Sequence, residues 1–468
     1  MSGALGELLA AALASLAHPV ESTNGERQGG GQLRVLADRV AAALKAKGVR
    51  PAEPVLLGMG NRPADIGALL GLWQAGAVAA PLAVAAAPAT YERLKSRTGA
   101  RFLVDGDHID IVAPAPPPER PLLRDAALIM FTSGSTGAPK GAVIGHRRLA
   151  DKLVVLDRLL GFDRGDVVLL PLQLTFIFGL WASLLALKNG LRLVLVPKFS
   201  HEALARGLEE STILGGVPSM FRTLLGEAPP AAPKLRKILT GGEVLAPHLA
   251  DVMRRWSPAA IHDLYGLTET GTCDFHCGPA EQPQGFGSIG RATENVDFRI
   301  ADSGELQIRS PYCMLGYLDD PALTEASFAN GFFKTGDLAK LDENGRVALI
   351  GRAKDIISRG GIKIAPLEID NLLAEHPDVA AALCAGVADA RLGEVIHAVI
   401  VPRNGATLDP AALRAWLLER AERYMVPEVF YVCDVLPSGS TGKADRRAVA
   451  RLAEGGVSRP SPDKPSRA

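Results

Sequence analysis

The chain has 468 residues, more than the roughly 250–300 at which a single hydrophobic core stops growing, so we expect one large unit and at least one smaller one. Its 51 basic and 51 acidic residues cancel, which argues against a nucleic-acid-binding protein and against binding to anionic membranes. The longest strongly apolar run, 174–187, is shorter than the roughly 18–20 residues of a membrane span, so we expect no membrane insertion.

Five cysteines, an odd and sparse number, favour reduced thiols in a cytoplasmic protein. Cys273 and Cys277 lie close together, with His276 between them. Structural zinc usually takes four ligands in two spaced pairs, and a second pair is missing. We therefore expect ordinary packing here in preference to a metal site, and leave open whether these two cysteines have a further role.

Helical and strand patterns alternate along the first part of the chain. Apolar residues recur at helical spacing from Leu33 to Leu44, and the pattern stops at Gly48, a typical C-terminal cap. The apolar run 55–57 predicts a strand, and a second helical pattern covers 66–74. Further short aliphatic runs occur at 127–131, 167–170 and 191–196. Strands alternating with helix-length segments predict an α/β architecture of parallel sheets covered by helices.

The last third of the chain has a different character. Turns at Gly304 and Gly345 predict a β-rich section. A compact region of its own follows a boundary near Gly351, with helices near 366–374 and 410–421. The end of the chain, rich in Pro, Ser and Lys, is expected to be disordered.

The segment TSGSTGAPKG (132–141) follows directly on the apolar run 127–131. Glycines let backbone N–H groups approach a phosphate, hydroxyls add neutral donors and lysine adds charge. Its spacing is not that of a Walker A loop, and a flexible linker would rarely follow a buried strand and end in Pro-Lys-Gly. We therefore predict a phosphate-binding loop, with Thr132, Ser133, Gly134, Ser135, Thr136, Gly137 and Lys140 as candidate contacts.

Three further segments carry polar groups suited to a nucleotide. YGLTET (265–270) places an aromatic ring, hydroxyls and the Glu269 carboxylate together, and a carboxylate is a preferred ligand of Mg²⁺. Asp337 could hold ribose hydroxyls, although a Thr-Gly-Asp turn is usually only a turn. Lys443 ends a Ser/Gly-rich turn, where it could equally be a solvated charge beside a helix.

In this order the segments resemble the adenylate-forming superfamily, which includes acyl-CoA and aryl-CoA ligases, peptide-synthetase adenylation domains and luciferases. The resemblance implies a large N-terminal domain of layered sheets (1–351), a hinge (352–355) and a small mobile α+β domain (356–453), before the disordered tail (454–468). It runs from about residue 30 to about residue 450. The blocks that carry it are TSGSTGAPKG (132–141), YGLTET (265–270), GELQIRSP (304–311), KTGDLA (334–339), GRAKDIISRGGIKIAPLEID (351–370) and GSTGK (439–443).

The resemblance also implies residue roles. The loop 132–141 would bind the β- and γ-phosphates of ATP, Thr268 would reach the α-phosphate, and Glu269 would bind Mg²⁺. Lys443 would pair with the substrate carboxylate and the α-phosphate. Lys354 would be the hinge residue. The other implied contacts are Gly242, Glu243, Tyr265 and Gly266 for the nucleotide, Asp337 and Arg352 for the ribose, and Gly360 and Gly361 for the channel of the incoming thiol.

The implied reaction joins an acid to AMP, releasing pyrophosphate, and then transfers the acyl group to coenzyme A, releasing AMP. Many acyl- and aryl-CoA ligases carry His where this chain has Phe176, a residue that could stack on a ring or simply fill the core. The segment 171–181 resembles the corresponding aromatic-rich segment of benzoate-type CoA ligases, which implies an aromatic or compact apolar acid in preference to a long fatty acid. An amino acid is less favoured, because no carboxylate at a matching place would hold its ammonium group. The predicted substrate residues are Phe176, Gly241, Thr270 and Gly271.

Two alternatives remain open. A stand-alone adenylation enzyme would load its acyl group onto the phosphopantetheine of a carrier protein instead of coenzyme A. A catalytically inactive nucleotide-binding protein would be expected to lack part of the set Lys140, Glu269, Asp337 and Lys443, all of which are present. The sequence identifies neither the acid nor the oligomeric state.

Overall fold

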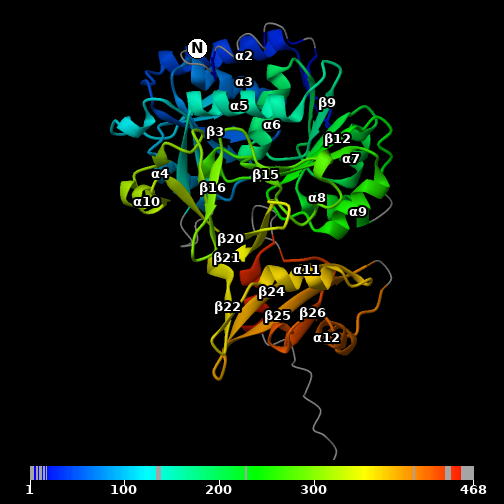
Figure 1. Cartoon of the computed structure of the whole chain (residues 1–468). Coiled ribbons are helices and arrows are strands. Elements are labelled where there is room, and N and C mark those ends of the chain that lie inside the picture. The colour runs from blue at the N-terminus through cyan, green and yellow to red at the C-terminus, as the bar shows by residue number, and fades with distance from the viewer. Residues whose placement is uncertain are drawn as a thin grey trace, which may run out of the picture. The chain divides into compact units, whose positions relative to one another are not determined.

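The computed structural model describes residues 18–132, 139–226, 229–403, 406–437 and 444–454, together with Leu5, Gly6, Leu9, Leu13 and Leu16. The chain divides into two compact units (Figure 1). The first unit comprises Met1–Leu245, Val252–Arg299 and Gln307–Thr335, and the second comprises Ala246–Asp251, Ile300–Leu306 and Gly336–Ala468. The α/β class is confirmed, whereas the limits 1–351, 352–355 and 356–453 stay predictions.

One sheet of the first unit has nine strands, in the order β15-β14-β13-β12-β11-β9-β10-β1-β2. Its six central strands, β13 to β1 in that order, are parallel, and their apolar sequences reflect burial on both faces. The carboxyl ends of β11, β12 and β13 therefore meet at one edge. The strands are β1 (Val20–Ser22), β2 (Arg27–Gln28), β9 (Val167–Leu170), β10 (Arg192–Leu195), β11 (Ile213–Gly216), β12 (Lys237–Gly241), β13 (Ala260–Tyr265), β14 (Phe275–Cys277) and β15 (Arg291–Ala292).

A second sheet of the first unit has seven strands, in the order β18-β8-β7-β4-β3-β5-β6. Its strands β7 and β8 are antiparallel, so Thr132 at the end of β7 is the cross-strand partner of Lys140 at the start of β8. The two ends of the predicted phosphate loop are thereby fixed by the sheet. The strands are β3 (Pro54–Met59), β4 (Val78–Ala83), β5 (Phe102–Asp105), β6 (His108–Ile111), β7 (Ala126–Thr132), β8 (Lys140–Gly145) and β18 (Gly316–Tyr317).

Helices of the first unit join these two sheets into one core, which includes residues of both sheets and of α2, α3, α5 and α6. The predicted helices 33–44 and 66–74 are confirmed as parts of α2 and α3. The apolar run 174–187 forms most of α6, which is apolar on all sides because it is buried on all sides. The helices α2 to α10 are Gly30–Ala46, Pro63–Gln74, Pro88–Thr98, His146–Leu160, Ile177–Lys188, His201–Leu208, Pro218–Gly226, Pro247–Trp256 and Pro321–Ala326.

In a third sheet, which has five strands, some strands contain residues of both units. The predicted turns at Gly304 and Gly345 are confirmed, and both glycines have positive φ, +81° and +71°. Its order is β16-β17-β20-β19, with β21 paired to β20. The strands are β16 (Asp297–Ile300), β17 (Glu305–Arg309), β19 (Phe328–Ala329), β20 (Phe332–Leu341) and β21 (Val347–Arg352).

The rest of the second unit is an α+β structure in which α11 and α13 pack on β24 (Figure 1). The predicted helix 366–374 is confirmed as α11 (Pro366–Ala374), and the helix predicted near 410–421 is α12 (Pro410–Leu418). The predicted disorder of the tail concerns residues almost entirely outside the described ones. The other elements are β22 (Ile357–Arg359), β23 (Ile362–Ile364), β24 (Val379–Asp389), β25 (Gly393–Pro402), β26 (Val429–Val432) and α13 (Arg446–Glu454).

Among the described residues, no helix combines the length and the apolar character that crossing a membrane requires.

Candidate functional site

Glu269 is the centre of a polar cluster in the first unit. Its carboxylate follows the carboxyl end of β13, on the short 3-10 helix η2 (Thr268–Thr270), and only 9% of the residue is exposed. Glu269 Oε1 accepts hydrogen bonds from Thr132 Oγ1 at 3.2 Å and from Tyr317 Oη at 3.1 Å. Two segments singled out in the sequence, one in each sheet, therefore meet at this carboxylate.

Tyr317 organises this cluster and was not predicted. It is 4% exposed, and burial, reinforced by the neighbouring Glu269 carboxylate, raises the pKa of its hydroxyl above the ordinary value. Lys140 Nζ lies 5.4 Å from the centroid of the Tyr317 ring, an arrangement that favours the cation. Tyr317 thus contacts Lys140 through its ring and the Glu269 carboxylate through its hydroxyl. The predicted contacts Ser133, Gly134, Ser135, Thr136 and Gly137 lie outside the described residues.

Two of the predicted glycines are explained by close backbone approach at the ends of β12 and β13. A Cβ on Gly241 would collide with the carbonyl oxygen of Leu264 on the neighbouring strand. A Cβ on Gly266 would collide with the backbone nitrogen of Cys273, in the turn that returns toward β14. These glycines therefore allow the edge of the sheet to close tightly around η2, a role that does not itself require a ligand.

Beside Gly241, the chain turns through Gly242, whose φ is +80°. The next residue, Glu243, accepts hydrogen bonds from Ser219 Oγ at 2.7 Å and from Arg222 Nη2 at 2.9 Å. These partners fix Glu243 at the edge of the nine-stranded sheet where β13 also ends. The predicted nucleotide contacts Gly242 and Glu243 thus lie at the same edge of the sheet as Gly266, and their nucleotide role stays a prediction.

The predicted substrate residues fall into two groups. Phe176 is 39% exposed at the N-terminus of α6, which does not fit a side chain that fills the core. Thr270, in contrast, is fully buried, and its hydroxyl donates to Asp274 Oδ2. Gly271, with φ +91°, packs against the backbone of Tyr312. Thr270 and Gly271 therefore support the turn after Glu269, and a direct contact with substrate stays a prediction.

Asp337, Arg352 and Lys354 belong to the second unit. Asp337 on β20 and Arg352 on β21 are cross-strand partners, and Arg352 Nε lies 2.8 Å from Asp337 Oδ1. Asp337 is 3% exposed, whereas Lys354 follows on the short helix η4 (Ala353–Asp355). Burial, with a contribution from Arg352, lowers the pKa of the Lys354 ammonium. The carboxylate proposed for ribose is therefore already held in an ion pair.

Gly360 and Gly361 form the two-residue turn between β22 and β23, with φ of +57° and +86°. A tight hairpin turn of this kind needs positive φ at both positions, so the backbone alone explains both glycines. Their predicted place beside a thiol channel is neither required nor opposed by this geometry. Lys443 lies outside the described residues.

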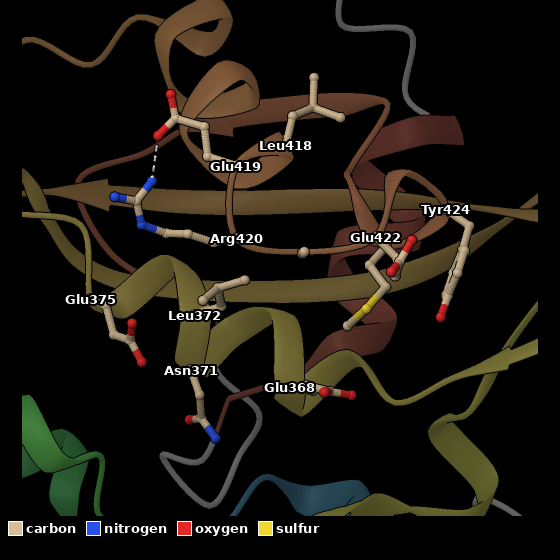
Figure 2. Close-up of a pocket in the computed structure, with 11 residues that line it drawn as sticks. Glu368, Asn371, Leu372, Glu375, Leu418, Glu419, Arg420, Glu422 and Tyr424 are labelled. Carbon is tan, nitrogen blue, oxygen red and sulfur yellow. Dashed lines mark hydrogen bonds and ion pairs between the residues drawn. The ribbon is translucent and has the colours of Figure 1, made fainter.

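The second unit also contains an open hollow that holds none of the predicted site residues (Figure 2). α11 and the segment that follows α12 line it. Four carboxylates line it against one guanidinium, Arg420, which pairs with Glu419 at 2.9 Å. A surface of this charge disfavours the phosphates of a nucleotide, so we assign the hollow no part in the site. The carboxylates are Glu368, Glu375, Glu419 and Glu422.

Asp263, on β13 of the nine-stranded sheet, makes the free energy of unfolding depend on pH. Burial raises the pKa of its carboxyl from 3.8 to about 8, opposed only in part by a hydrogen bond from the Leu264 N–H. Above the unfolded pKa, the folded chain keeps a proton that the unfolded chain has released. The free energy of unfolding contributed by this group is thus fully present below pH 3.8 and is lost as the pH rises through about 8, with a slope of at most about 1.4 kcal/mol per pH unit.

The substitution Asp263→Asn, which removes this proton, is therefore expected to stabilise the protein relative to the wild type as the pH rises from about 5 to about 8.5. Urea unfolding of both proteins across this range measures the difference. Two stability curves that stay parallel would show that Asp263 does not hold the proton in the folded state.

Comparison with known proteins gives a consistent result. Residues 12–318 match the AMP-binding enzyme family, and residues 368–443 match the AMP-binding enzyme C-terminal domain. A feruloyl-CoA synthase from Amycolatopsis is 32% identical over 88% of this chain and 91% of its own length. An indoleacetate–CoA ligase from Aromatoleum aromaticum is 33% identical over 78% of this chain and 72% of its own.

Among solved structures, the o-succinylbenzoate CoA synthetase of Bacillus subtilis in complex with its acyl-adenylate intermediate superposes with a TM-score of 0.81 at 26% identity, covering 94% of this chain and 97% of that one. The two family matches, 12–318 and 368–443, include residues of both units, and the first includes Lys140 and Glu269. The chain belongs to the AMP-binding enzyme family of adenylate-forming enzymes.

Proposed function

We propose that this protein is an AMP-forming carboxylic acid–CoA ligase that uses ATP and acts on an aromatic acid. The observation that carries the proposal is the convergence of Thr132, Lys140 and Glu269 around one tyrosine. A cation, hydroxyl donors and a carboxylate at the mouth of a Gly/Ser-rich loop suit the polyphosphate of ATP.

In the first step an oxygen of the substrate carboxylate attacks the α-phosphorus of ATP. The bond between the α-phosphorus and its bridging oxygen breaks, and pyrophosphate leaves. Lys140 would bind the leaving phosphates, and Thr268 and Lys443 would stabilise the negative charge that develops at the α-phosphate. These groups act by position and charge, since the reaction needs no proton transfer from the protein.

Glu269 fits a magnesium site. Mg²⁺ is usually held by one or two carboxylates together with substrate phosphates and water, not by a full cage of protein ligands. Glu269 offers one carboxylate, with the Thr132 hydroxyl beside it, and no group of three or more His, Cys, Asp or Glu that could hold a metal occurs in the described part of the chain. When bound there, Mg²⁺ would neutralise phosphate charge.

In the second step the sulfur of a thiol attacks the acyl carbonyl carbon and a C–S bond forms. The bond between the acyl carbon and the phosphate oxygen breaks, AMP leaves with its electron pair, and the thiol proton is released to solvent. Coenzyme A is the proposed thiol, because the relatives reported above are named as CoA ligases or synthetases. A carrier-protein phosphopantetheine remains the alternative thiol, and no feature of the described residues favours it.

The names of the relatives reported above support the substrate class, since feruloyl, indoleacetate and o-succinylbenzoate denote aromatic acids. A small apolar hollow at the carboxyl end of β11 does not add to this argument, because its free volume of about 10 Å³ has room for no more than a water molecule. The lining residues include Pro171, Phe199, Leu214, Met220, Phe221 and Leu224.

The test is a reaction of the full-length protein with Mg-ATP, coenzyme A and a pooled panel of aromatic and aliphatic acids, read by mass spectrometry. We expect the CoA thioester of an aromatic acid together with AMP. A parallel reaction replaces coenzyme A with a phosphopantetheinylated carrier protein. Acylation of the carrier alone would reassign the thiol, a thioester of aliphatic acids alone would reject the substrate class, and no AMP from any acid would reject the ligase function.

A further inference from the structure

Helix α5 carries two cations on one face, Arg148 and Lys152, which are four residues apart. Lys152 is 1% exposed, an unusual location for a lysine, which is seldom fully buried unless its charge is satisfied. Lys152 Nζ donates to the carbonyl oxygen of Cys273 at 2.8 Å and lies 3.4 Å from Thr293 Oγ1. It also lies 5.0 Å from the centroid of the Tyr312 ring. The ammonium is therefore fully engaged inside the first unit.

The acceptor of Lys152 belongs to the turn that follows Glu269. This turn places two residues other than glycine, Thr272 and Cys273, at positive φ, +67° and +47°. Such conformations are costly and persist only where the surroundings hold them. The Cys273 carbonyl receives hydrogen bonds from Lys152 and, at 3.0 Å, from Thr293 Oγ1. These two donors hold the strained turn in place.

The same turn is connected to η2 from the inside. Asp274, which is fully buried, accepts the hydroxyl hydrogen of Thr270, the last residue of η2. Burial raises the pKa of that carboxyl to about 7, and the nearby Lys152 ammonium opposes this shift. The Lys152 ammonium thus donates to the Cys273 carbonyl and interacts electrostatically with the Asp274 carboxylate. These two groups fix the end of η2, directly after Glu269.

Arg148 holds the chain on the other side of Glu269. Its guanidinium donates to the carbonyl oxygens of Cys313 and Met314. The Met314 N–H in turn donates to the Glu269 carbonyl oxygen at 2.7 Å. One face of α5 therefore supports both the turn after Glu269 and the segment 313–314, which hydrogen-bonds to the Glu269 backbone.

Burial with satisfied donors is not by itself a sign of function, and Lys237 shows this. Lys237 is also buried, donates to the carbonyl oxygens of Leu160 and Gly161, and lies 5.5 Å from the centroid of the Phe162 ring. It begins β12, however, at the end of the strand opposite to Gly241. The two lysines make the same kinds of contact. They differ in the location of their acceptors: the acceptor of Lys152 belongs to the turn after Glu269, and those of Lys237 lie away from the polar cluster.

We propose that Lys152 is a positioning residue for acyl-adenylate formation: it holds the turn 270–274 so that Thr268 and Glu269 keep the geometry that the transition state requires. The proposal rests on the function proposed above. Lys152 touches no substrate; it acts through the Cys273 carbonyl and, with Asp274, through Thr270.

The test compares Lys152→Met with Lys237→Met, each of which removes a buried ammonium and keeps an unbranched side chain. Rates of acid-dependent AMP formation are measured against the concentrations of acid, ATP and Mg²⁺, and melting temperatures are recorded with and without Mg-ATP. For Lys152→Met we expect kcat to fall roughly 10-fold to 100-fold with little change in KM for the acid, because small misplacements of catalytic groups have effects of this size. We also expect a higher Mg²⁺ requirement and a smaller rise in melting temperature with Mg-ATP. Lys237→Met should lower the melting temperature alone.

Thr293→Val removes one of the two side-chain donors to the Cys273 carbonyl at nearly constant volume, and should show the same changes to a smaller extent even if Lys152→Met fails to fold. Wild-type kcat and Mg²⁺ response in folded Lys152→Met, or in Thr293→Val if Lys152→Met does not fold, would overturn the proposal. Losses of kcat that follow the melting temperature equally in the Lys152 and Lys237 variants would also overturn it. A wild-type protein that forms no AMP with any acid would instead reject the proposed function, and this inference with it.

Discussion

Replacing Glu269 by glutamine is expected to lower the rate of acyl-adenylate formation by about 100-fold to 1000-fold while leaving the protein folded. Glutamine keeps a side-chain oxygen that can accept the hydrogen bonds from Thr132 and Tyr317. It lacks the negative charge that a hard divalent cation prefers. The loss should therefore fall on the chemical step and on its dependence on Mg²⁺, and much less on folding. Initial rates of AMP release at several Mg²⁺ concentrations measure it.

Glu53→Gln is the matched control. Glu53 is also a buried carboxylate, 3% exposed, and it accepts hydrogen bonds from Arg101 at 2.9 and 3.0 Å, but it directly precedes β3, at the amino end of that strand. Its substitution should reduce stability without changing the rate of adenylation. Tyr317→Phe should have an intermediate effect of about tenfold, because it removes one hydrogen bond to a charged group. A folded Glu269→Gln protein with the wild-type rate would remove Glu269 from the proposed site.

The fold was predictable where local chemistry determines it. The helix that ends before Gly48 has a clear stop signal and the helix that begins at Pro366 has a clear start signal, and both helices were found in the expected places. Turn residues at Gly304 and Gly345 likewise indicated hairpins, since positive φ is inexpensive only for glycine. Signals of this kind depend on only a few consecutive residues, so they can be recognised in the sequence.

The polar cluster was predictable only in part. A Gly/Ser-rich loop and a carboxylate after a strand indicated Thr132 and Glu269 as site residues. Because the two residues are far apart in the sequence, their hydrogen bond could not be predicted. Tyr317 gave no signal, because a tyrosine in a two-residue strand has no distinctive pattern. Lys152 was not predicted for a different reason. It is one of several charged residues in the sequence of α5, and only the fold shows that its side chain is buried.

Some residues predicted at the substrate or at the thiol channel also have a structural explanation in the fold, so their ligand roles stay predictions. Thr270 was expected at the substrate, yet its hydroxyl is directed to the buried Asp274. Gly360 and Gly361 were expected at a thiol channel, and the hairpin turn accounts for both without one. In each case a backbone or packing requirement imposes the same residue type that a ligand contact would, so sequence alone cannot separate the two.

Lys443→Met is expected to separate the two half-reactions. The rate of acyl-adenylate formation should fall by about 100-fold to 1000-fold, since a cation at the α-phosphate stabilises charge that develops only in that step. Thioester formation from a supplied acyl-adenylate should remain near the wild-type rate, because a rotation of the small domain about the hinge that the family resemblance implies at Lys354 would carry Lys443 away before the thiol attacks. Single-turnover measurements with ATP and with the acyl-adenylate give the two rates separately.

The first helical residue after the Lys443 segment is anchored in the core of the second unit. Arg446, three residues further on, begins α13 and donates to the carboxylate of Asp370 and to the carbonyl oxygen of Cys384, both in the core of that unit. Any movement of this unit would therefore carry α13 with it, and the prediction assumes that Lys443 moves together with α13. Lys340→Met, which removes an exposed cation of the same unit, is the control and should change neither rate. Equal losses in both half-reactions for Lys443→Met would contradict the proposed division of labour, because they would mean that the lysine is also needed while the thiol attacks.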